Sequence, residues 1–335
     1  MVSLACLFTA VLAVLPAGLN AYPNPLPFTG DITSPLGSSP TMCKLGATYF
    51  IFTGGIGIPI YTSADLVAWT HVGSVFPAGA PWTAPYTGGD NLKLWAPDCR
   101  IVNGAFRLFY AASTLGSQNS AIFYAYSTTG ASGTWTNGGL VLSSSAADDF
   151  NASSFISSSL FHAQVIQLGY RSQPEYPVPY LSFGSYWSGI KGVQLNPTTY
   201  LPLSATYDSL AYRDNGVEPM GLPNSEEAPV IWHYGDFWYL FTSWNADKAY
   251  YQIHVARSST YNSGYIGEAG LAALDNGGTL ILPAHDLILG PGGQDIFVDT
   301  DGTPYIVYHY KVGTALTHQI GLNKLNMSTG WPVVI

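Results

Sequence analysis

The chain of 335 residues is rich in apolar and aromatic side chains and poor in charge: 47% of residues are hydrophobic, 14% aromatic and 9% charged. A disordered chain has the opposite balance, so the composition favours a packed globular protein. Eleven Lys and Arg against 20 Asp and Glu give a net charge of −9. This charge excludes a broad basic surface for nucleic acid or an anionic membrane, whereas the many hydroxyl groups suit a neutral, hydroxylated ligand.

Residues 1–21 have the pattern of a secretory signal peptide. Residues 4–15 are apolar but too few to span a membrane, and the segment ends on a small residue, Ala21. The segment has no Lys or Arg, and an N-terminal anchor is the alternative. We predict a secreted, extracellular protein whose mature chain, residues 22–335, forms a single domain.

Two cysteines remain after this segment, because Cys6 lies within it. An even pair in an oxidising compartment predicts a disulfide between Cys43 and Cys99, with two buried free thiols as the alternative. Asn-x-Ser sequons at Asn151 and Asn326 are consistent with secretion and predict N-glycosylation.

Short aromatic and β-branched runs separated by Gly, Pro, Ser and Asn dominate the chain, with almost no helical periodicity. One kind of run recurs about every 60 to 70 residues, at 49–52, 106–110, 180–183, 238–241 and 305–308. A second strand-like segment follows each run, at 58–62, 121–127, 192–195, 253–258 and 320–325. This repeat predicts an all-β chain folded as a five-bladed β-propeller, with a β-sandwich or β-helix as the alternative.

Most reactive motifs are absent from the sequence. There is no G-x-S-x-G, H-E-x-x-H, C-x-x-C or phosphate loop. The seven histidines lack the spacing of metal ligands, so we predict no metal and no cofactor. His309 lies between two tyrosines in an apolar run, and we interpret it as a hydrogen-bonded packing residue.

Carboxylates are scarce, so the pair Glu226 and Glu227 ahead of a strand from Val230 stands out. Adjacent side chains of an extended backbone point opposite ways, and we expect only one to lie inside. Asp98, in a W-A-P-D run, is a candidate ligand residue or a turn cap. The run 183–189 (FGSYWSG) has Tyr and Trp rings that suit sugar faces, or that fill space between sheets.

Six motifs, in order and with similar spacing from about Asn24 to the C-terminus, resemble the fungal arabinan endo-1,5-α-L-arabinosidases of glycoside hydrolase family 43. They are LWAPDC (94–99), STLGSQNSAI (113–122), LSFGSYWSGI (181–190), EAP (227–229), GPGGQD (290–295) and GWPVV (330–334). The resemblance implies a five-bladed propeller that hydrolyses α-1,5-linked arabinofuranose chains with inversion, in a groove across its central channel. The implied partner is a polysaccharide, arabinan or related pectic side chains, and we expect a monomer.

The resemblance also implies the catalytic positions. The family's general acid lies in E-A-P, at Glu227 here. Its general base lies in H-D-P-[ST]-M, where this chain reads SSPTM and Ser39 replaces the base. Its third carboxylate, which orients the acid and raises its pKa, lies in N-A-I-D-P-[NS]-L-F, where Ser157 replaces it. We expect sugar contacts from Asn151, Ser185, Tyr186, Trp187, Trp95 and Asn119.

These two serines predict impaired hydrolysis. A serine hydroxyl cannot take a proton from water at neutral pH, and general acid or base help is worth about 10² to 10⁴ in rate. We expect an arabinan hydrolase weakened by this loss, with a catalytically degenerate carbohydrate-binding paralogue as the alternative. A structural or interaction protein with neither property is a third hypothesis. A glycan at Asn151 would crowd the groove.

Two further possibilities concern the same site. Asp31, Asp148 or Asp149 would replace a missing carboxylate if one lay about 6.5 to 9.5 Å from Glu227, and we expect that none does. Some members of the wider family hold a channel ion through a G-P-G-H histidine, but this chain has Gly293 there. A channel ion is conceivable but has no ligand histidine in this segment to support it.

Overall fold

The computed structural model describes residues 22–33, 35, 37–152, 179–214, 225–245, 250–313 and 317–335. Within these ranges helix is limited to α1 (Ala84–Thr87) and three single 3-10 turns, η1 (Asp31–Thr33), η2 (Pro81–Thr83) and η3 (Ala273–Asp275). Strands make up the remaining regular structure, which confirms the all-β class. In the same ranges, no helix is long and apolar enough to cross a membrane. The predicted signal peptide lies outside the described residues.

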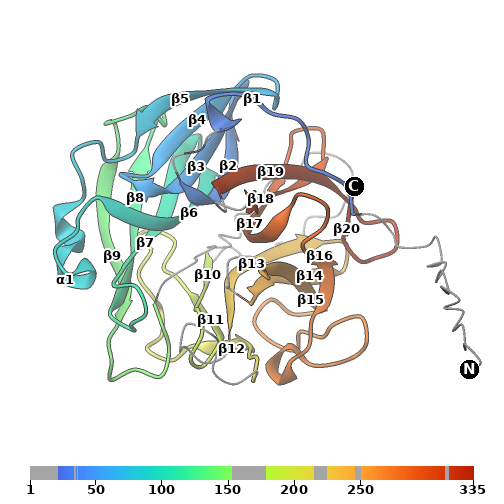
Figure 1. The fold of residues 1–335 in the computed structure, drawn as a ribbon. Coiled ribbons are helices and arrows are strands. Elements are labelled where there is room, and N and C mark those ends of the chain that lie inside the picture. Colours follow the sequence, from blue (N-terminus) through green and yellow to red (C-terminus); the bar gives the residue numbers. More distant parts are fainter. Residues whose placement is uncertain are drawn as a thin grey trace, which may run out of the picture.

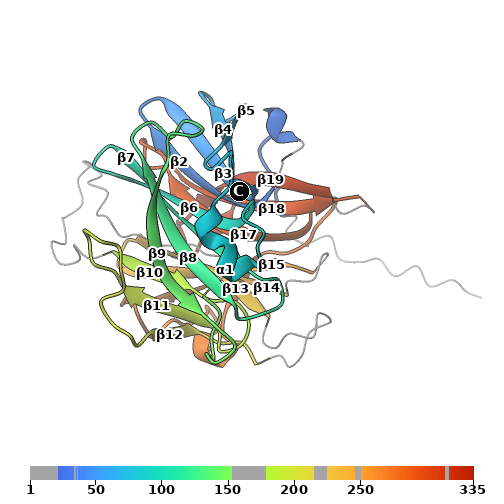
Figure 2. The ribbon, with the colours of Figure 1, turned by 90° about the vertical axis from the view of Figure 1, so that its left-hand side faces the viewer.

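The strands form five consecutive groups along the chain, numbered 1 to 5 here (Figures 1 and 2). Neighbouring strands within each group are antiparallel, and β1 (Thr29–Gly30) adds to β5 in parallel. Group 1 consists of β2 (Ser38–Leu45), β3 (Thr48–Ile56), β4 (Pro59–Ser63) and β5 (Ala68–Ser74), and group 2 of β6 (Lys93–Val102), β7 (Ala105–Ser113), β8 (Ser120–Ser127) and β9 (Thr136–Ser144). Group 3 consists of β10 (Tyr180–Phe183), β11 (Ile190–Gln194) and β12 (Asp208–Ala211), and group 4 of β13 (Glu226–Tyr234), β14 (Phe237–Trp244), β15 (Gln252–Ser258) and β16 (Thr279–Leu282). Group 5 consists of β17 (Leu289–Val298), β18 (Pro304–Val312), β19 (Thr317–Asn326) and β20 (Val333–Val334).

Every recurring aromatic run occupies a strand. The five runs lie in β3, β7, β10, β14 and β18, and the segments that follow them form β4, β8, β11, β15 and β19. In groups 1, 2, 4 and 5 the aromatic run is the second strand of its group. In group 3 it is the first strand described, since residues 153–178 lie outside the described residues. The predicted repeat of strands is therefore confirmed.

Groups 1 and 2 are joined into one sheet of nine strands, which the sequence repeat did not predict. The end of β3 pairs with the start of β6 at Gly55 and Leu94. Gly54 permits this close approach, because a Cβ there would lie only 3.0 Å from the backbone nitrogen of Ala96.

Apolar clusters fill the space between successive groups, and the last cluster packs group 5 against group 1. Their buried members come from both groups in each case. Examples are Phe52 with Phe106, Ile122 with Leu181, Ile190 with Leu240, Val230 with Ile306, and Val307 with Ile51. The packing order thus returns to the group with which it began.

The first strands of groups 1, 2, 4 and 5 carry the same irregularity, which we call the inner bulge. In each strand the register shifts between two residues, Ser38 and Thr41, Trp95 and Asp98, Glu227 and Val230, or Gly292 and Asp295. Inside each shift one residue has positive φ: Ser39 (50°), Ala96 (42°), Ala228 (55°) or Gly293 (58°). A proline follows in three of the four, which is tolerated because a bulge leaves its donor unpaired.

The strands with inner bulges are also neighbours in space. Contacts join β6 to β2, β2 to β17, and β17 to β13, and Figure 1 shows these strands around the middle of the molecule. The four bulges therefore lie close to one another although they are far apart in the sequence.

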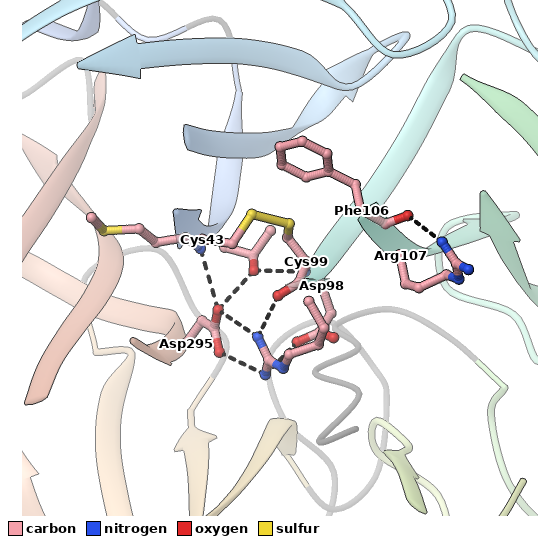
Figure 3. Close-up of a disulfide and its surroundings, with 9 residues drawn as sticks. Cys43, Asp98, Cys99, Phe106, Arg107 and Asp295 are labelled. Atoms are coloured by element: carbon pink, nitrogen blue, oxygen red, sulfur yellow. Dashed lines mark hydrogen bonds and ion pairs between the residues drawn. A yellow bond between two sulfur atoms is a disulfide. The ribbon is translucent and has the colours of Figure 1, made fainter. Parts of the chain in front are cut away.

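The Asp295 carboxylate joins the first strands of groups 1, 2 and 5 (Figure 3). Its Oδ2 accepts a hydrogen bond from Thr41 Oγ1 at 2.7 Å, and its Oδ1 lies 3.1 Å from Arg100 Nη2. Arg100 Nη2 also lies 2.7 Å from Oδ1 of the buried Asp98. Thr41 Oγ1 in turn accepts from the Cys99 amide at 2.9 Å. Asp98 is therefore part of a buried ion-pair network within a strand and is not a turn cap.

The predicted disulfide is confirmed beside this network. Cys43 on β2 and Cys99 on β6 are bonded, with a Cα–Cα distance of 6.0 Å. The crosslink closes a sequence separation of 56 residues, which corresponds to about 4 kcal/mol in the chain-entropy model. It therefore reinforces the contact between groups 1 and 2.

We predict that Asp295→Ala lowers the free energy of unfolding by about 3 to 5 kcal/mol, because it removes the acceptor of the Thr41 hydroxyl and one of the two carboxylates that compensate Arg100. Chemical denaturation measures this change. Lys93→Ala is the control, since it breaks an exposed pair with Asp90 at 3.6 Å and should change stability by less than about 1 kcal/mol. Equal losses in the two variants would contradict a structural role of the Asp295 network.

Candidate functional site

The Glu227 carboxylate lies at the inner bulge of β13, with 1% of the residue exposed. Its Oε2 accepts a hydrogen bond from Ser185 Oγ at 2.7 Å, and its Oε1 accepts one from the Tyr251 hydroxyl at 2.8 Å. Ser185 belongs to the loop between β10 and β11, and Tyr251 directly precedes β15. Two distant segments therefore fix the orientation of this carboxylate.

Tyr251 remains a hydrogen-bond donor at any physiological pH. Burial, together with the negative charge of Glu227, raises its pKa well above the ordinary value. Its ring packs against Gly292, where a Cβ would lie 2.1 Å from the ring. The ring centroid is 5.7 Å from that of His309, so Tyr251 lies next to both Glu227 and His309.

Ser39 lies at the inner bulge of β2, in contact with His309. Its backbone N–H donates to Nδ1 of His309 at 3.1 Å, and its Oγ lies 3.0 Å from the position of a Cβ on Gly293. Burial lowers the pKa of His309 well below 6.5, with the nearby His318 and Lys311 adding to the shift. The ring is therefore neutral and its Nδ1 accepts, which confirms the hydrogen-bonded role expected of His309.

Side chains also connect the inner bulges of β13 and β17. The Gly293 amide donates to Ser243 Oγ at 3.0 Å, and Ser243 Oγ donates to Gln294 Oε1 at 2.5 Å. Gln294 Nε2 donates to the carbonyl of Ala228 at 2.7 Å. Sequence reasoning missed both side chains: Gln294 was visible within GPGGQD, but nothing near Ser243 marked it.

The aromatic loop 184–189 lies against Glu227 through both side chain and backbone. The Tyr186 amide donates to the carbonyl of Glu226 at 3.0 Å, and the Ser188 amide donates to that of Asp149 at 3.2 Å. Tyr186 and Trp187 both have positive φ, 56° and 42°, and their rings meet edge to face at 6.3 Å. The structure thus brings three predicted contact residues, Ser185, Tyr186 and Trp187, next to the predicted acid.

The other predicted contact residues lie in groups 2 and 3. Asn151 is buried, and its Nδ2 donates to a backbone carbonyl of the β7–β8 turn at 3.2 Å. Asn119 Nδ2 donates to a carbonyl of α1 at 3.3 Å. Trp95 is the last paired residue before the inner bulge of β6, just as Glu227 is the last paired residue before the inner bulge of β13. The roles of these residues in sugar binding stay predictions.

Two predictions concern Ser157 and the glycosylation sequons. Ser157 lies outside the described residues, as does Ser153 of the first sequon. A glycan on Asn151 would require its buried Nδ2 to become exposed and lose its hydrogen bond. Asn326, at the end of β19, is exposed. Glycosylation at both positions stays a prediction.

The alternative carboxylates have local partners. Asp31 Oδ2 accepts from the His71 amide on β5 at 2.9 Å, and Asp148 Oδ2 accepts from the Ser145 amide at 2.7 Å. Asp149 has an exposed side chain. The expectation that no shifted aspartate replaces a missing carboxylate stays a prediction.

Glu226 is buried as well, so the expectation that only one glutamate of the pair lies inside was wrong. The two side chains do point to different partners, but both sides of β13 are covered. Glu226 Oε1 accepts from Thr242 Oγ1 at 2.9 Å and from Trp244 Nε1 at 3.0 Å. Burial raises the pKa of Glu226 to about 7, against the opposing effects of these two bonds and of Arg213.

Metal ligands do not gather in the described part of the chain. No group of three or more His, Cys, Asp or Glu side chains there is arranged to hold a metal ion. The predicted absence of metal and cofactor stays a prediction.

Comparison with known proteins gives consistent matches. The model of glycosyl hydrolases family 43 matches residues 32–332. Arabinan endo-1,5-α-L-arabinosidase A of Aspergillus niger is 36% identical over 304 residues, 86% of each chain. A probable arabinan endo-1,5-α-L-arabinosidase A of Aspergillus flavus is 31% identical over 345 residues, 97% of this chain and 98% of the relative.

Solved structures agree with these relatives. An arabinanase of Bacillus subtilis superposes with a TM-score of 0.75 and 30% identity, over 89% of this chain and 97% of that one. An α-L-arabinanase of Cellvibrio cellulosa in complex with arabinohexaose gives a TM-score of 0.76 and 28% identity, over 90% of this chain and 96% of that one.

We predict that the neutral His309 makes folding less stable in acid. Its folded-state pKa lies below 6.5, so the unfolded chain binds an extra proton as the pH falls below 6.5. Stability contributed by His309 is then lost at up to about 1.4 kcal/mol per pH unit. In His309→Gln the amide oxygen still accepts the Ser39 N–H but does not titrate.

Urea unfolding of both proteins at pH 5, 6 and 7.5 measures this difference. Glu226 titrates in both proteins, so its own contribution cancels in the comparison. We expect the stability advantage of the wild type over the variant to shrink between pH 7.5 and 5. Parallel pH profiles would contradict the assignment.

Proposed function

Because the chain belongs to glycosyl hydrolase family 43, we propose that it is a secreted protein of the arabinan endo-1,5-α-L-arabinosidase type. It binds arabinan of plant cell walls and hydrolyses the α-1,5 bonds slowly, with inversion. The matching relatives bear this activity in their names, and one similar structure contains arabinohexaose.

We also propose that the five strand groups are the blades of a propeller. Consecutive groups pack through apolar clusters, and group 5 packs on group 1. The inner bulges then surround a central channel, and the chain of residues 22–335 is one domain.

The binding half of the proposal rests on the aromatic loop beside Glu227. Tyr186 and Trp187 present ring surfaces suited to the apolar face of a sugar, and Ser185 and neighbouring backbone groups supply hydrogen bonds. Their low charge matches a neutral polysaccharide. Arabinan would lie across this loop with a scissile bond at Glu227.

Glu227 would act as the general acid, which protonates the leaving oxygen in an inverting reaction. The hydroxyl groups of Ser185 and Tyr251 keep its carboxyl group in one orientation. A fixed orientation is what proton transfer to a positioned oxygen requires.

The single observation that limits the activity is Ser39 at the inner bulge of β2, the base position implied by the family motif. The backbone N–H of Ser39 binds His309, whose ring lies beside Tyr251, and Tyr251 in turn binds Glu227. A serine there can hold a water molecule by a hydrogen bond but cannot remove its proton. Hydrolysis is therefore slower by the factor of about 10² to 10⁴ that a general base contributes.

The same observation favours a second candidate function, a carbohydrate-binding protein without catalysis. In that case the aromatic loop retains its use, and Glu227 serves only as a hydrogen-bond acceptor for a sugar hydroxyl. Ser157 in place of the third carboxylate would reduce the remaining activity further.

We predict that Ser39→Asp increases the release of oligosaccharides from linear arabinan by about 10² to 10⁴. Aspartate tolerates positive φ better than most residues, so the inner bulge accepts it. Reducing-sugar release measures the gain. Ser38→Asp is the matched control, because it adds the same charge one residue away, and Glu227→Gln in the Ser39→Asp background should abolish the gain.

Retardation of the wild type in an affinity gel that contains linear or branched arabinan tests binding alone. Retardation with slow release, lost in Glu227→Gln, supports the weakened enzyme. Retardation without any release supports the binding protein. Neither retardation nor release, together with no gain in Ser39→Asp, would overturn both readings.

A further inference from the structure

Glu226 is a buried titratable group that the proposed reaction does not use. Only 2% of the residue is exposed. Its Oε1 accepts the bonds from Thr242 and Trp244, whereas its Oε2 is buried and has no hydrogen-bond partner among the described residues. A buried carboxylate oxygen without a partner is costly, and the neutral acid fits this setting better than the anion.

Three charged or titratable groups near Glu226, namely Arg213, His254 and Tyr251, keep their state across the neutral range. Arg213 is always a cation, and its guanidinium lies 4.5 Å from the Trp244 ring, with Nη1 donating to Asn245 and to a backbone carbonyl. His254 stacks on Trp244 at 3.6 Å, and burial lowers its pKa to about 3. The pKa of Tyr251 lies well above its ordinary value. Glu227, the adjacent residue, is held by its own two donors.

Glu226 is linked to the site in three ways: by its side chain, by its backbone carbonyl and by its position next to Glu227 in the sequence. Its side chain is bound to β14, opposite Trp244 in the register of the two strands. Its carbonyl accepts the Tyr186 amide of the aromatic loop at 3.0 Å. The next residue is Glu227. A displacement of Glu226 therefore moves the acid and releases the loop together.

We propose that Glu226 is a positioning residue of this site: as the neutral acid it holds the start of β13 against β14, and its ionisation loosens both Glu227 and the aromatic loop. The charge placed on the unpartnered Oε2 draws the side chain toward Arg213 or toward water, and the bonds to Thr242 and Trp244 are lost. The titration and the loosening do not depend on the proposed function; only the choice of arabinan as ligand rests on it.

The first experiment needs no ligand. Hydrogen exchange of the segment around Tyr186 is measured by mass spectrometry between pH 5.5 and 8 and corrected for the intrinsic rate. In the wild type, we expect the protection of this segment against exchange to fall about tenfold at pH 8, because Glu226 is then mostly ionised. Glu226→Gln, a neutral isostere, should keep its protection, and Glu268→Gln, which removes an exposed carboxylate, should behave as the wild type.

The second experiment uses calorimetric binding of arabinohexaose at pH 5.5 and pH 8. If the loosened form does not bind, the wild type and Glu268→Gln lose about tenfold in affinity at pH 8, while Glu226→Gln keeps its affinity. Equal affinities at the two pH values in the wild type would overturn the proposal. Absence of binding in all three proteins refutes the proposed function, and the exchange experiment then decides the role of Glu226.

A third variant keeps the proposal testable if Glu226→Gln does not fold. Trp244→Phe removes a hydrogen bond to Oε1 that only the closed, neutral form makes, so the loosened form is favoured and the midpoint of the exchange transition should move downward from about 7. A wild type without a transition, or a midpoint unchanged in Trp244→Phe, would overturn the proposal.

Discussion

The architecture depends on the contact between the first strands of groups 1, 2 and 5, where no β-ladder is available. Among the described residues, β2 and β17 each form main-chain pairs only inside their own group, and β6 pairs with group 1 only at the end of β3. The carboxylate of Asp295 therefore supplies what main-chain pairing does not, by binding Thr41 and Arg100 at once. Because its acceptor positions are all used, the buried charge is compensated and the strands have one relative position.

That position determines the geometry of the site. The four inner bulges are brought together, and their main-chain groups become the anchors: the Ser39 amide for His309, the Gly293 amide for Ser243, and the Ala228 carbonyl for Gln294. The carboxylate at Glu227 is then oriented by Ser185 and Tyr251. The scaffold of the site is thus built from neutral hydrogen bonds, and its construction does not require the carboxylates that catalysis requires.

The sequence predicted local features better than contacts between distant segments. Aromatic runs of fixed spacing correctly located strands, since alternation and β-branched residues act over a few residues, and the two cysteines identified their disulfide by elimination. The union of groups 1 and 2 has a local signal in the pair Gly54 and Gly55, which allows the close approach of β6. The W-A-P-D and E-A-P runs likewise share a proline position, which marks the inner bulge in hindsight.

Other features had no local signal. Arg100, which pairs with Asp98, also binds a carboxylate 195 residues away, and nothing in the sequence near Arg100 indicates that partner. Burial of Glu226 depends on Thr242 and Trp244, which come from the next strand. Tyr251, which binds Glu227, lies in a segment that carries no motif. Such groups are recognisable only once the strands are placed, because their chemistry is set by neighbours that arrive from elsewhere in the chain.

The inner bulge has an evolutionary consequence. Its shape requires a residue that tolerates positive φ and, in three strands, a following proline, but it makes no demand on the charge of that residue. The bulges hold Ser, Ala or Gly at this place, so the same backbone shape is compatible with more than one side chain there. Selection for folding therefore acts on the backbone shape of the bulge, whereas selection for activity acts on the side chain that it carries. A lineage that no longer needs a degrading enzyme can retain the molecule as a lectin.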